Sequence, residues 1–155
     1  MSHSLAKVYI HYVWSTKYRE RLLIGEARER VREHILTYTA QNSISLETLN
    51  VQPEHVHLLM LLGRDQKIED IAKLLKGESS HWINQNNIIK PKFSWQTGYA
   101  AFSVSYQNIG AVRRYIEGQD EHHRRKSFEE EFEEMLRKSG YSDTEIAELL
   151  QQGNR

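Results

Sequence analysis

Two histidines lie two positions apart in the segment PEHVHLL, residues 53–59. His55 and His57 occupy alternate positions of an apolar run that is typical of a β-strand, so both imidazoles point to the same side of that strand. Two such positions are about 7 Å apart at the backbone, a separation from which two rings can converge on one ion. The pair therefore predicts two of the ligands of a metal site. The alternative is a pair of half-exposed strand histidines with ordinary hydrogen bonds.

The histidine pair needs a third ligand, and the choice of metal depends on it. Imidazoles alone favour zinc or another transition metal, whereas an added oxygen donor admits Mg²⁺ or Mn²⁺. Three protein ligands would leave coordination positions open, as a catalytic metal site requires. The H-x-H-x-H pattern of histidine-triad nucleotide hydrolases is excluded because Leu59 occupies its third position.

A second group of reactive residues lies in the segment RRYIEGQDEHH, residues 113–123. Tyr115 and Gln119 are four positions apart and would share one face of a helix. The amide oxygen of Gln119 can complete the metal site, and the phenol of Tyr115 can attack a phosphodiester if a metal or nearby cations lower its pKa. Without any such chemistry, Tyr115 would be a packed ring of an amphipathic helix with its hydroxyl in water, and Gln119 would be a surface amide. Other candidates are Tyr106 as the nucleophile and His122 or His123 as the third ligand.

The elements that position these residues follow from hydrophobic periodicity and from turn residues. On strand His55–Leu62, the side chains of Val56, Leu58 and Met60 are predicted to face the core, so the histidines belong to the opposite, open face. The predicted order is β-α-β-β-α-β followed by further helices, which is a ferredoxin-like (RRM-like) α+β fold with an antiparallel sheet. The predicted strands span residues 7–16, 45–51, 55–62 and about 99–105, and the predicted helices span residues 25–42, 67–87, 108–125, 127–140 and 142–150.

Composition narrows the function classes. The chain of 155 residues fits one domain, and the absence of cysteine excludes a disulfide framework, a thiolate zinc site and a cysteine nucleophile. No long uncharged apolar run is present, so a cytoplasmic protein without membrane segments is expected. Residues 129–155 carry eight acidic and three basic side chains, so residues 1–128 carry a net charge of +5, with eighteen basic and thirteen acidic side chains. This asymmetry is compatible with a polyanionic partner.

The histidine and tyrosine segments together make a family resemblance visible. The chain resembles the single-tyrosine HUH transposases of small insertion sequences, the IS200-like and REP-associated tyrosine transposases. His55-Val56-His57 matches the HUH motif, and Tyr115-Ile116-Glu117-Gly118-Gln119 matches the family's Tyr-Ile-x-x-Gln helix. Two further blocks agree, STKYRE (residues 15–20) after the first strand and WQTGYAAFSVS (residues 95–105) before the tyrosine helix. The similarity extends from about Val8 to Arg125.

The resemblance implies an enzyme that cleaves and rejoins single-stranded DNA through a 5′-phosphotyrosine intermediate. It implies Tyr115 as the nucleophile, with His55, His57 and Gln119 as ligands of Mg²⁺ or Mn²⁺. It further implies a homodimer joined through the sheet, in which the tyrosine helix can complete the histidine pair of its own subunit or of the partner. Recognition of a subterminal DNA hairpin and action on the nucleoid of a prokaryotic cell are also implied. On this reading residues 1–126 form the transposase catalytic domain, and residues 127–155 form an acidic helical extension of the same domain.

The remaining expectations concern nucleic-acid contacts and the principal alternative. A protein of the same fold that binds hairpins without catalysis, or a domesticated one, could instead use Tyr9 and His11 as a stacking face for bases. Basic residues in three segments are the candidate DNA contacts. They are Lys17, Arg19, Arg21, Lys73, Lys76, Arg113 and Arg114.

Overall fold

The computed structural model describes residues 2–153. The chain forms two compact units, Met1–Glu117 and Gly118–Arg155. The first unit contains the whole sheet, and the second contains only helices among its described residues. The boundary between these compact units lies between Glu117 and Gly118. The boundary expected between the catalytic domain and its extension, after residue 126, remains a prediction.

The sheet has four strands in the order β2-β3-β1-β4, and every neighbouring pair is antiparallel. β1 and β3 are central because they carry the longest apolar runs. This strand order confirms the predicted ferredoxin-like α+β fold, and two of the predicted strands have the observed bounds. The strands are β1 (Val8–Ser15), β2 (Ser45–Val51), β3 (His55–Leu62) and β4 (Ala100–Val104).

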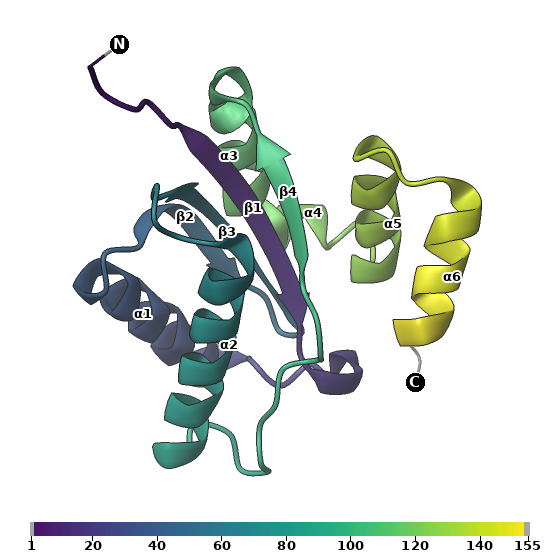
Figure 1. Ribbon diagram of the computed structural model, residues 1–155. Coiled ribbons are helices and arrows are strands. Elements are labelled where there is room, and N and C mark those ends of the chain that lie inside the picture. Colours follow the sequence, from purple (N-terminus) through teal and green to yellow (C-terminus); the bar gives the residue numbers. More distant parts are fainter. Residues whose placement is uncertain (1, 154–155) are drawn as a thin grey trace. The chain divides into compact units, whose positions relative to one another are not determined.

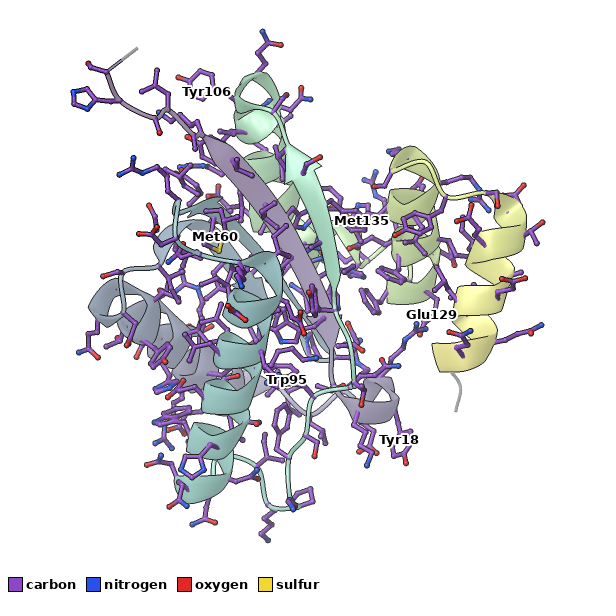
Figure 2. The ribbon with its side chains drawn as sticks, in the orientation of Figure 1. Tyr18, Met60, Trp95, Tyr106, Glu129 and Met135 are labelled. Carbon is purple, nitrogen blue, oxygen red and sulfur yellow. The ribbon has the colours of Figure 1, made fainter. Side chains whose placement is uncertain are left out.

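One face of the sheet is covered by α1 (Gly25–Gln41) and α2 (Ile68–Gln85). The larger core lies between them and the strands, and it includes Val56, Leu58 and Met60 from β3. Figure 1 shows these two helices side by side against the strands, and Figure 2 labels Met60 near α2. The alternation predicted for β3 is therefore confirmed.

The sequence predicted that the opposite face of the sheet would be open, but in the structure this face is covered. It is covered by α3 (Ile109–Glu117), whose apolar residues at helical spacing pack on this face. The resulting second core contains Tyr9, Leu59 and Ile116, with Ile109 and Val112 packed against them. Hydrophobic burial explains the difference, because Tyr9 and Leu59 would otherwise expose a continuous apolar patch.

The predicted single helix over residues 108–125 is wrong. The structure has a short 3₁₀ helix η2 (Tyr106–Asn108), then α3, and then a separate helix α4 (Gln119–His122). Gly118 has φ −88° and ψ 17°, outside the α-helical region, so the helix ends there. Glycine favours such an interruption because it loses more backbone freedom in a helix than any other residue.

The second unit continues with α5 (Phe128–Lys138) and α6 (Asp143–Gly153). Ser127 caps α5 by accepting from the amide of Glu130. The predicted capping box of α6 is confirmed, since Ser142 and Glu145 each accept from the other's backbone amide. Gly140 stops α5 as predicted, and its φ of +97° is the left-handed conformation of a helix C′ residue.

Among the described residues, no helix combines the length and the apolar character needed to cross a membrane.

Candidate functional site

His55 and His57 lie side by side on the face of the sheet that carries α3. Both side chains are fully buried. Their ring centroids are 5.0 Å apart and the rings are nearly perpendicular, at 79°. A ring nitrogen of one lies within 4.8 Å of a ring nitrogen of the other. The predicted convergence of the two imidazoles is therefore present in the fold, although both rings are deeper than a half-exposed pair would be.

The Nδ1 atom of each histidine has a polar partner from the same unit. His57 Nδ1 lies 2.8 Å from Nε2 of His11, which comes from β1. His55 Nδ1 lies 2.6 Å from Oε1 of Glu54, in the turn before β3. Metal-binding histidines usually have such a partner on the ring nitrogen that does not hold the metal. Two imidazoles of this kind suit a divalent cation, with Nε2 as the ligand atom in each.

Tyr115 lies next to this pair. Its ring centroid is 5.8 Å from that of His57, edge to face at 89°, and 6.4 Å from that of His11. The tyrosine belongs to the stripe of α3 that packs on the sheet, and its side chain is only partly buried. One chain therefore supplies the phenol and both imidazoles within one compact unit.

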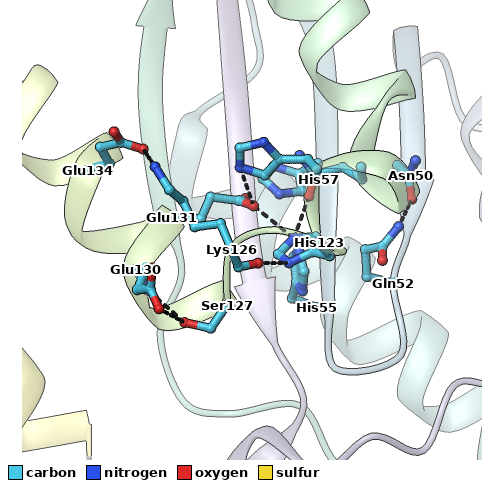
Figure 3. A network of polar contacts seen from close by, with 12 residues as sticks. Asn50, Gln52, His55, His57, His123, Lys126, Ser127, Glu130, Glu131 and Glu134 are labelled. Atoms are coloured by element: carbon cyan, nitrogen blue, oxygen red, sulfur yellow. Dashed lines mark hydrogen bonds and ion pairs between the residues drawn. The ribbon is translucent and has the colours of Figure 1, made fainter.

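Polar side chains of β2 hold the C-terminal end of α3. Asn50 Nδ2 donates to the carbonyl oxygen of Ile116 at 2.9 Å, and Asn50 itself accepts from Gln52 at 2.8 Å. Figure 3 shows this Gln52–Asn50 contact close to His57. Asn50 pairs with His57 in the β2–β3 register, so the strand that supports α3 also borders the histidine pair. Arg113 adds an ion pair with Glu47.

Gln119 lies in the second unit, at the start of α4, and is fully buried. Its Oε1 atom lies 2.8 Å from Nε2 of His123. The same His123 nitrogen lies 2.7 Å from a carboxylate oxygen of Glu131, and the His123 Nδ1 atom is 3.0 Å from the carbonyl oxygen of Lys126. Figure 3 shows His123 between Lys126 and Glu131. The amide expected as a metal ligand thus belongs to a polar cluster with both alternative ligands, since His122 is 3.4 Å from Glu131.

The basic residues that follow β1 lie in a loop with an unusual backbone. This loop contains the 3₁₀ helix η1 (Lys17–Arg19), where Tyr18 and Arg19 have φ of 59° and 53°. Left-handed conformations at residues other than glycine are uncommon and tend to cluster at functional sites. Tyr18 is 72% exposed, with the Lys17 ammonium 5.3 Å from its ring, and Figure 2 shows it projecting from the loop. Arg21 differs, because it pairs with Glu54 at 2.5 Å.

The other predicted DNA contacts lie on opposite sides of the sheet. Lys73 is exposed on α2, whereas Lys76 is half-buried and donates to the carbonyl oxygens of Gln96 (2.9 Å) and Gly98 (2.5 Å). Burial lowers the pKa of the Lys76 ammonium below its usual value. Arg113 and the exposed Arg114 belong to α3, on the other face. The seven residues do not form one continuous surface.

Two residues that contact the histidine pair, Glu54 and His11, were not predicted from the sequence as part of this site. Glu54 is adjacent to His55 in sequence, and a carboxylate next to a candidate ligand was the available signal. His11 had no local signal, because it lies 46 positions before His57. His11 and Tyr9 were expected to form a stacking face for bases in the alternative reading. That expectation is wrong, since the two are only 6% and 7% exposed beneath α3.

The chain is therefore a small α+β protein, in which a ferredoxin-like sheet carries two buried imidazoles beneath a tyrosine-bearing helix. The family model described as "Transposase IS200 like" matches residues 4–119. The chain belongs to the IS200-like transposase family, and is thus a DNA transposase, of a family that cuts DNA strands and transfers them.

Individual relatives agree with the family. The chain is 31% identical over 114 residues to the ISDra2 transposase TnpA of Deinococcus radiodurans, which covers 70% of this chain and 81% of the relative. A protein of Deinococcus radiodurans R1, crystallised as a candidate transposase, is 28% identical with a TM-score of 0.62, over 77% of this chain and 95% of that one. The fold is shared with a REP-associated tyrosine transposase bound to a REP hairpin, at a TM-score of 0.60 and 17% identity, over 79% and 74% of the two chains.

Proposed function

We propose that this transposase cleaves and rejoins single-stranded DNA through a covalent bond to Tyr115. The observation that supports this most is the position of the phenol, with its ring centroid 5.8 Å from that of the buried His57. His55 and His57, with Gln119 as the third ligand, would hold one Mg²⁺ or Mn²⁺ ion. When bound, such an ion polarises the scissile phosphate and stabilises the charge that develops on it.

The reaction needs two exchanges at phosphorus. In the first, the Tyr115 oxygen forms a bond to the phosphorus while the phenol gives up its proton. The bond from phosphorus to the 3′ oxygen breaks, and that oxygen takes up a proton, leaving a free 3′ hydroxyl and a 5′-phosphotyrosine. In the second, a 3′ hydroxyl attacks the phosphotyrosine and releases the phenol. Because one phosphodiester is exchanged for another, no external energy source is required.

The proposed substrate is single-stranded DNA with a subterminal hairpin. A shared fold with a structure that contains a REP hairpin supports this choice. We further propose a homodimer joined through the sheet, acting in the cytoplasm on the nucleoid. We favour Lys17, Lys73 and Arg114 as the contacts to the backbone phosphates, because their side chains are exposed. Arg21 is exposed as well, but it pairs with Glu54.

A covalent adduct is the decisive test. The protein is incubated with a hairpin oligonucleotide labelled at its 3′ end, on the side of the cut that stays bound to the protein, and with Mn²⁺, and the products are separated on a denaturing gel. We expect a protein–DNA band that Tyr115→Phe abolishes, with the DNA mapped by mass spectrometry to the peptide containing Tyr115. The matched control is Tyr106→Phe, because Tyr106 is 74% exposed and should leave the band unchanged.

Other outcomes would identify the competing functions. Released cleavage product without an adduct, unaffected by Tyr115→Phe, indicates a metal-dependent hydrolase. Hairpin binding without any cleavage indicates a domesticated binding protein of the same fold. An adduct that survives Tyr115→Phe and disappears in Tyr106→Phe assigns the nucleophile to η2 instead of α3.

A further inference from the structure

The two imidazoles of the candidate metal site are held in different ways. His55 lies against a carboxylate, Glu54 Oε1, at 2.6 Å, whereas His57 lies against a second imidazole, His11 Nε2, at 2.8 Å. Each contact uses Nδ1 of the candidate ligand. What these partners do depends on where the single N–H of each neutral ring resides, since a metal can bind only a ring nitrogen that carries no proton.

Glu54 is well placed to determine the tautomer of His55. Its other carboxylate oxygen lies 2.5 Å from Nη1 of Arg21, and its carbonyl oxygen accepts from the amide of Thr16 at 2.8 Å. An arginine-paired carboxylate is ionised and can only accept hydrogen bonds. His55 must therefore donate through Nδ1, which leaves the Nε2 lone pair as its ligand atom.

His11 can fix His57 only if it acts as the acceptor. One proton lies between the two imidazole nitrogens, and it resides on either His57 Nδ1 or His11 Nε2. Only the first arrangement leaves Nε2 of His57 able to bind a cation. His11 is buried on β1, with its ring 6.1 Å from that of Phe102 and 6.4 Å from that of Tyr115, so packing restricts its orientation. The His11 ring thereby lies beside both a ligand and the proposed nucleophile.

We propose that Glu54 and His11 are the positioning residues of the metal site. They hold His55 and His57 as Nδ1–H tautomers and direct both Nε2 atoms toward one divalent cation. The inference rests on the proposed function, because it assigns a purpose to these contacts only if the histidine pair binds metal. It adds to that function two residues that are outside the HUH and tyrosine motifs.

The first test reads the tautomers directly in the metal-free protein. Nitrogen-15 shifts of labelled histidine side chains report which ring nitrogen carries the proton. We expect Nδ1–H for both His55 and His57 in the wild-type chain. Glu54→Ala should disturb only His55, and His11→Phe should disturb only His57. An Nε2-protonated His55 or His57 in the wild-type protein overturns the proposal, whether or not any variant folds.

The second test measures Mn²⁺ affinity by calorimetry in the absence of DNA. Loss of an outer hydrogen-bond partner of a metal-bound histidine typically weakens binding about 10–100-fold. We expect a loss of that size in Glu54→Ala and in His11→Phe. His11→Gln should restore most of the affinity, because a glutamine amide oxygen can accept where the imidazole nitrogen did. A ring that only fills space would instead be replaced best by phenylalanine.

The matched control is Glu78→Ala. Glu78 also binds a histidine, His34, at 2.8 Å, but this pair links α1 to α2 away from the candidate ligands. Its loss should leave Mn²⁺ affinity and the tautomers of His55 and His57 unchanged. Wild-type binding with equal affinity in Glu54→Ala and His11→Phe overturns the inference alone. Absence of Mn²⁺ binding by the wild-type chain overturns the proposed function, and the inference with it.

Discussion

At the scale of single residues, polar groups in the first unit have structural tasks that their sequence neighbours do not reveal. Tyr12 and Lys76 are examples. Tyr12 is fully buried on β1 and donates to the carbonyl oxygen of Ile68 at 2.9 Å. Lys76 stabilises the segment before β4 by donating hydrogen bonds to the backbone carbonyl oxygens of Gln96 and Gly98. Each of these side chains is better explained by the fold than by contact with DNA.

Tyr12 makes stability depend on alkaline pH. Burial, with Tyr99 beside it, raises the pKa of the Tyr12 phenol well above its ordinary value of 10.0. A raised pKa means that the unfolded chain loses its proton first, so the free energy of unfolding falls as the pH rises above 10. By pH 11 the ionisation of Tyr12 in the unfolded chain should have lowered the free energy of unfolding by about 1.4 kcal/mol.

Urea unfolding of wild type and Tyr12→Phe between pH 8 and pH 11 measures this effect. At pH 8 the variant should be less stable by about 1 kcal/mol, because it lacks one buried hydrogen bond. The difference should shrink or reverse by pH 11, since the variant has no proton to lose at this position. Parallel pH profiles would contradict the explanation.

Lys73 and Lys76 should separate DNA binding from stability, although both lie on α2. Lys76→Met is expected to lower the free energy of unfolding by about 1–2 kcal/mol through the loss of two charge-assisted hydrogen bonds. Lys73→Met should change stability by less than about 0.5 kcal/mol, because its side chain is exposed. For single-stranded DNA, Lys73→Met should reduce the slope of log affinity against log salt by about 0.7, whereas Lys76→Met should not. The reverse result would make Lys76 the phosphate contact.

At the scale of elements, α3 completes the candidate site, because it adds a tyrosine to the two histidines of the sheet. It packs on the face of the sheet that carries the histidines and brings Tyr115 close to His57. Most of the elements follow from periodicity, because strands of alternating pattern and amphipathic helices bury one face each. The helix break at Gly118 did not follow, since an isolated glycine is often tolerated within a helix.

Asn50 should control how firmly α3 is held. Asn50→Ala removes the hydrogen bond to the Ile116 carbonyl, worth about 1 kcal/mol, so the amides near the end of α3 should exchange with deuterium about five times faster. The adduct yield should fall in parallel. Asn42→Ala is the matched control, because the Asn42 amide bonds to the Tyr38 carbonyl at the end of α1. Equal effects of the two variants on α3 would rule out a specific role for Asn50.

The candidate site shows where sequence reasoning stops. His55, His57 and Tyr115 were identifiable, because short spacings on a strand or a helix determine which side chains share a face. His11 and Glu47 could not be placed in the same way, since their contacts to His57 and Arg113 depend on strand register and on the path of a distant helix. The covered face of the sheet also required tertiary packing to become apparent.

At the scale of the whole molecule, the two compact units differ in what they contain. All residues of both hydrophobic cores lie within the first unit, between Tyr9 and Ile116. The second unit contains Gln119 and the acidic helix α5. Lys126, just before α5, lowers the pKa of Glu134 in that helix by a hydrogen bond. The residues of these two hydrophobic cores therefore all come from the first unit, whereas the three proposed metal ligands come from both units.

A fragment of residues 1–117 should test this division. It contains the complete sheet with α1, α2 and α3, so we expect a mixed helix and sheet circular dichroism spectrum and a cooperative thermal transition. It should form no covalent adduct with hairpin DNA, because Gln119 is absent. The control is the full chain with Gln119→Ala, which should fail equally. A fragment that forms the adduct would remove Gln119 from the ligand set.

The packing of α3 on the sheet of its own chain has a genetic consequence. An allele encoding His57→Ala and another encoding Tyr115→Phe would each be defective for a different reason. If every polypeptide must provide nucleophile and imidazoles together, neither product can rescue the other in the same cell. A protein preparation from cells that co-express the two alleles would then form no covalent adduct with hairpin DNA, just as each variant alone forms none.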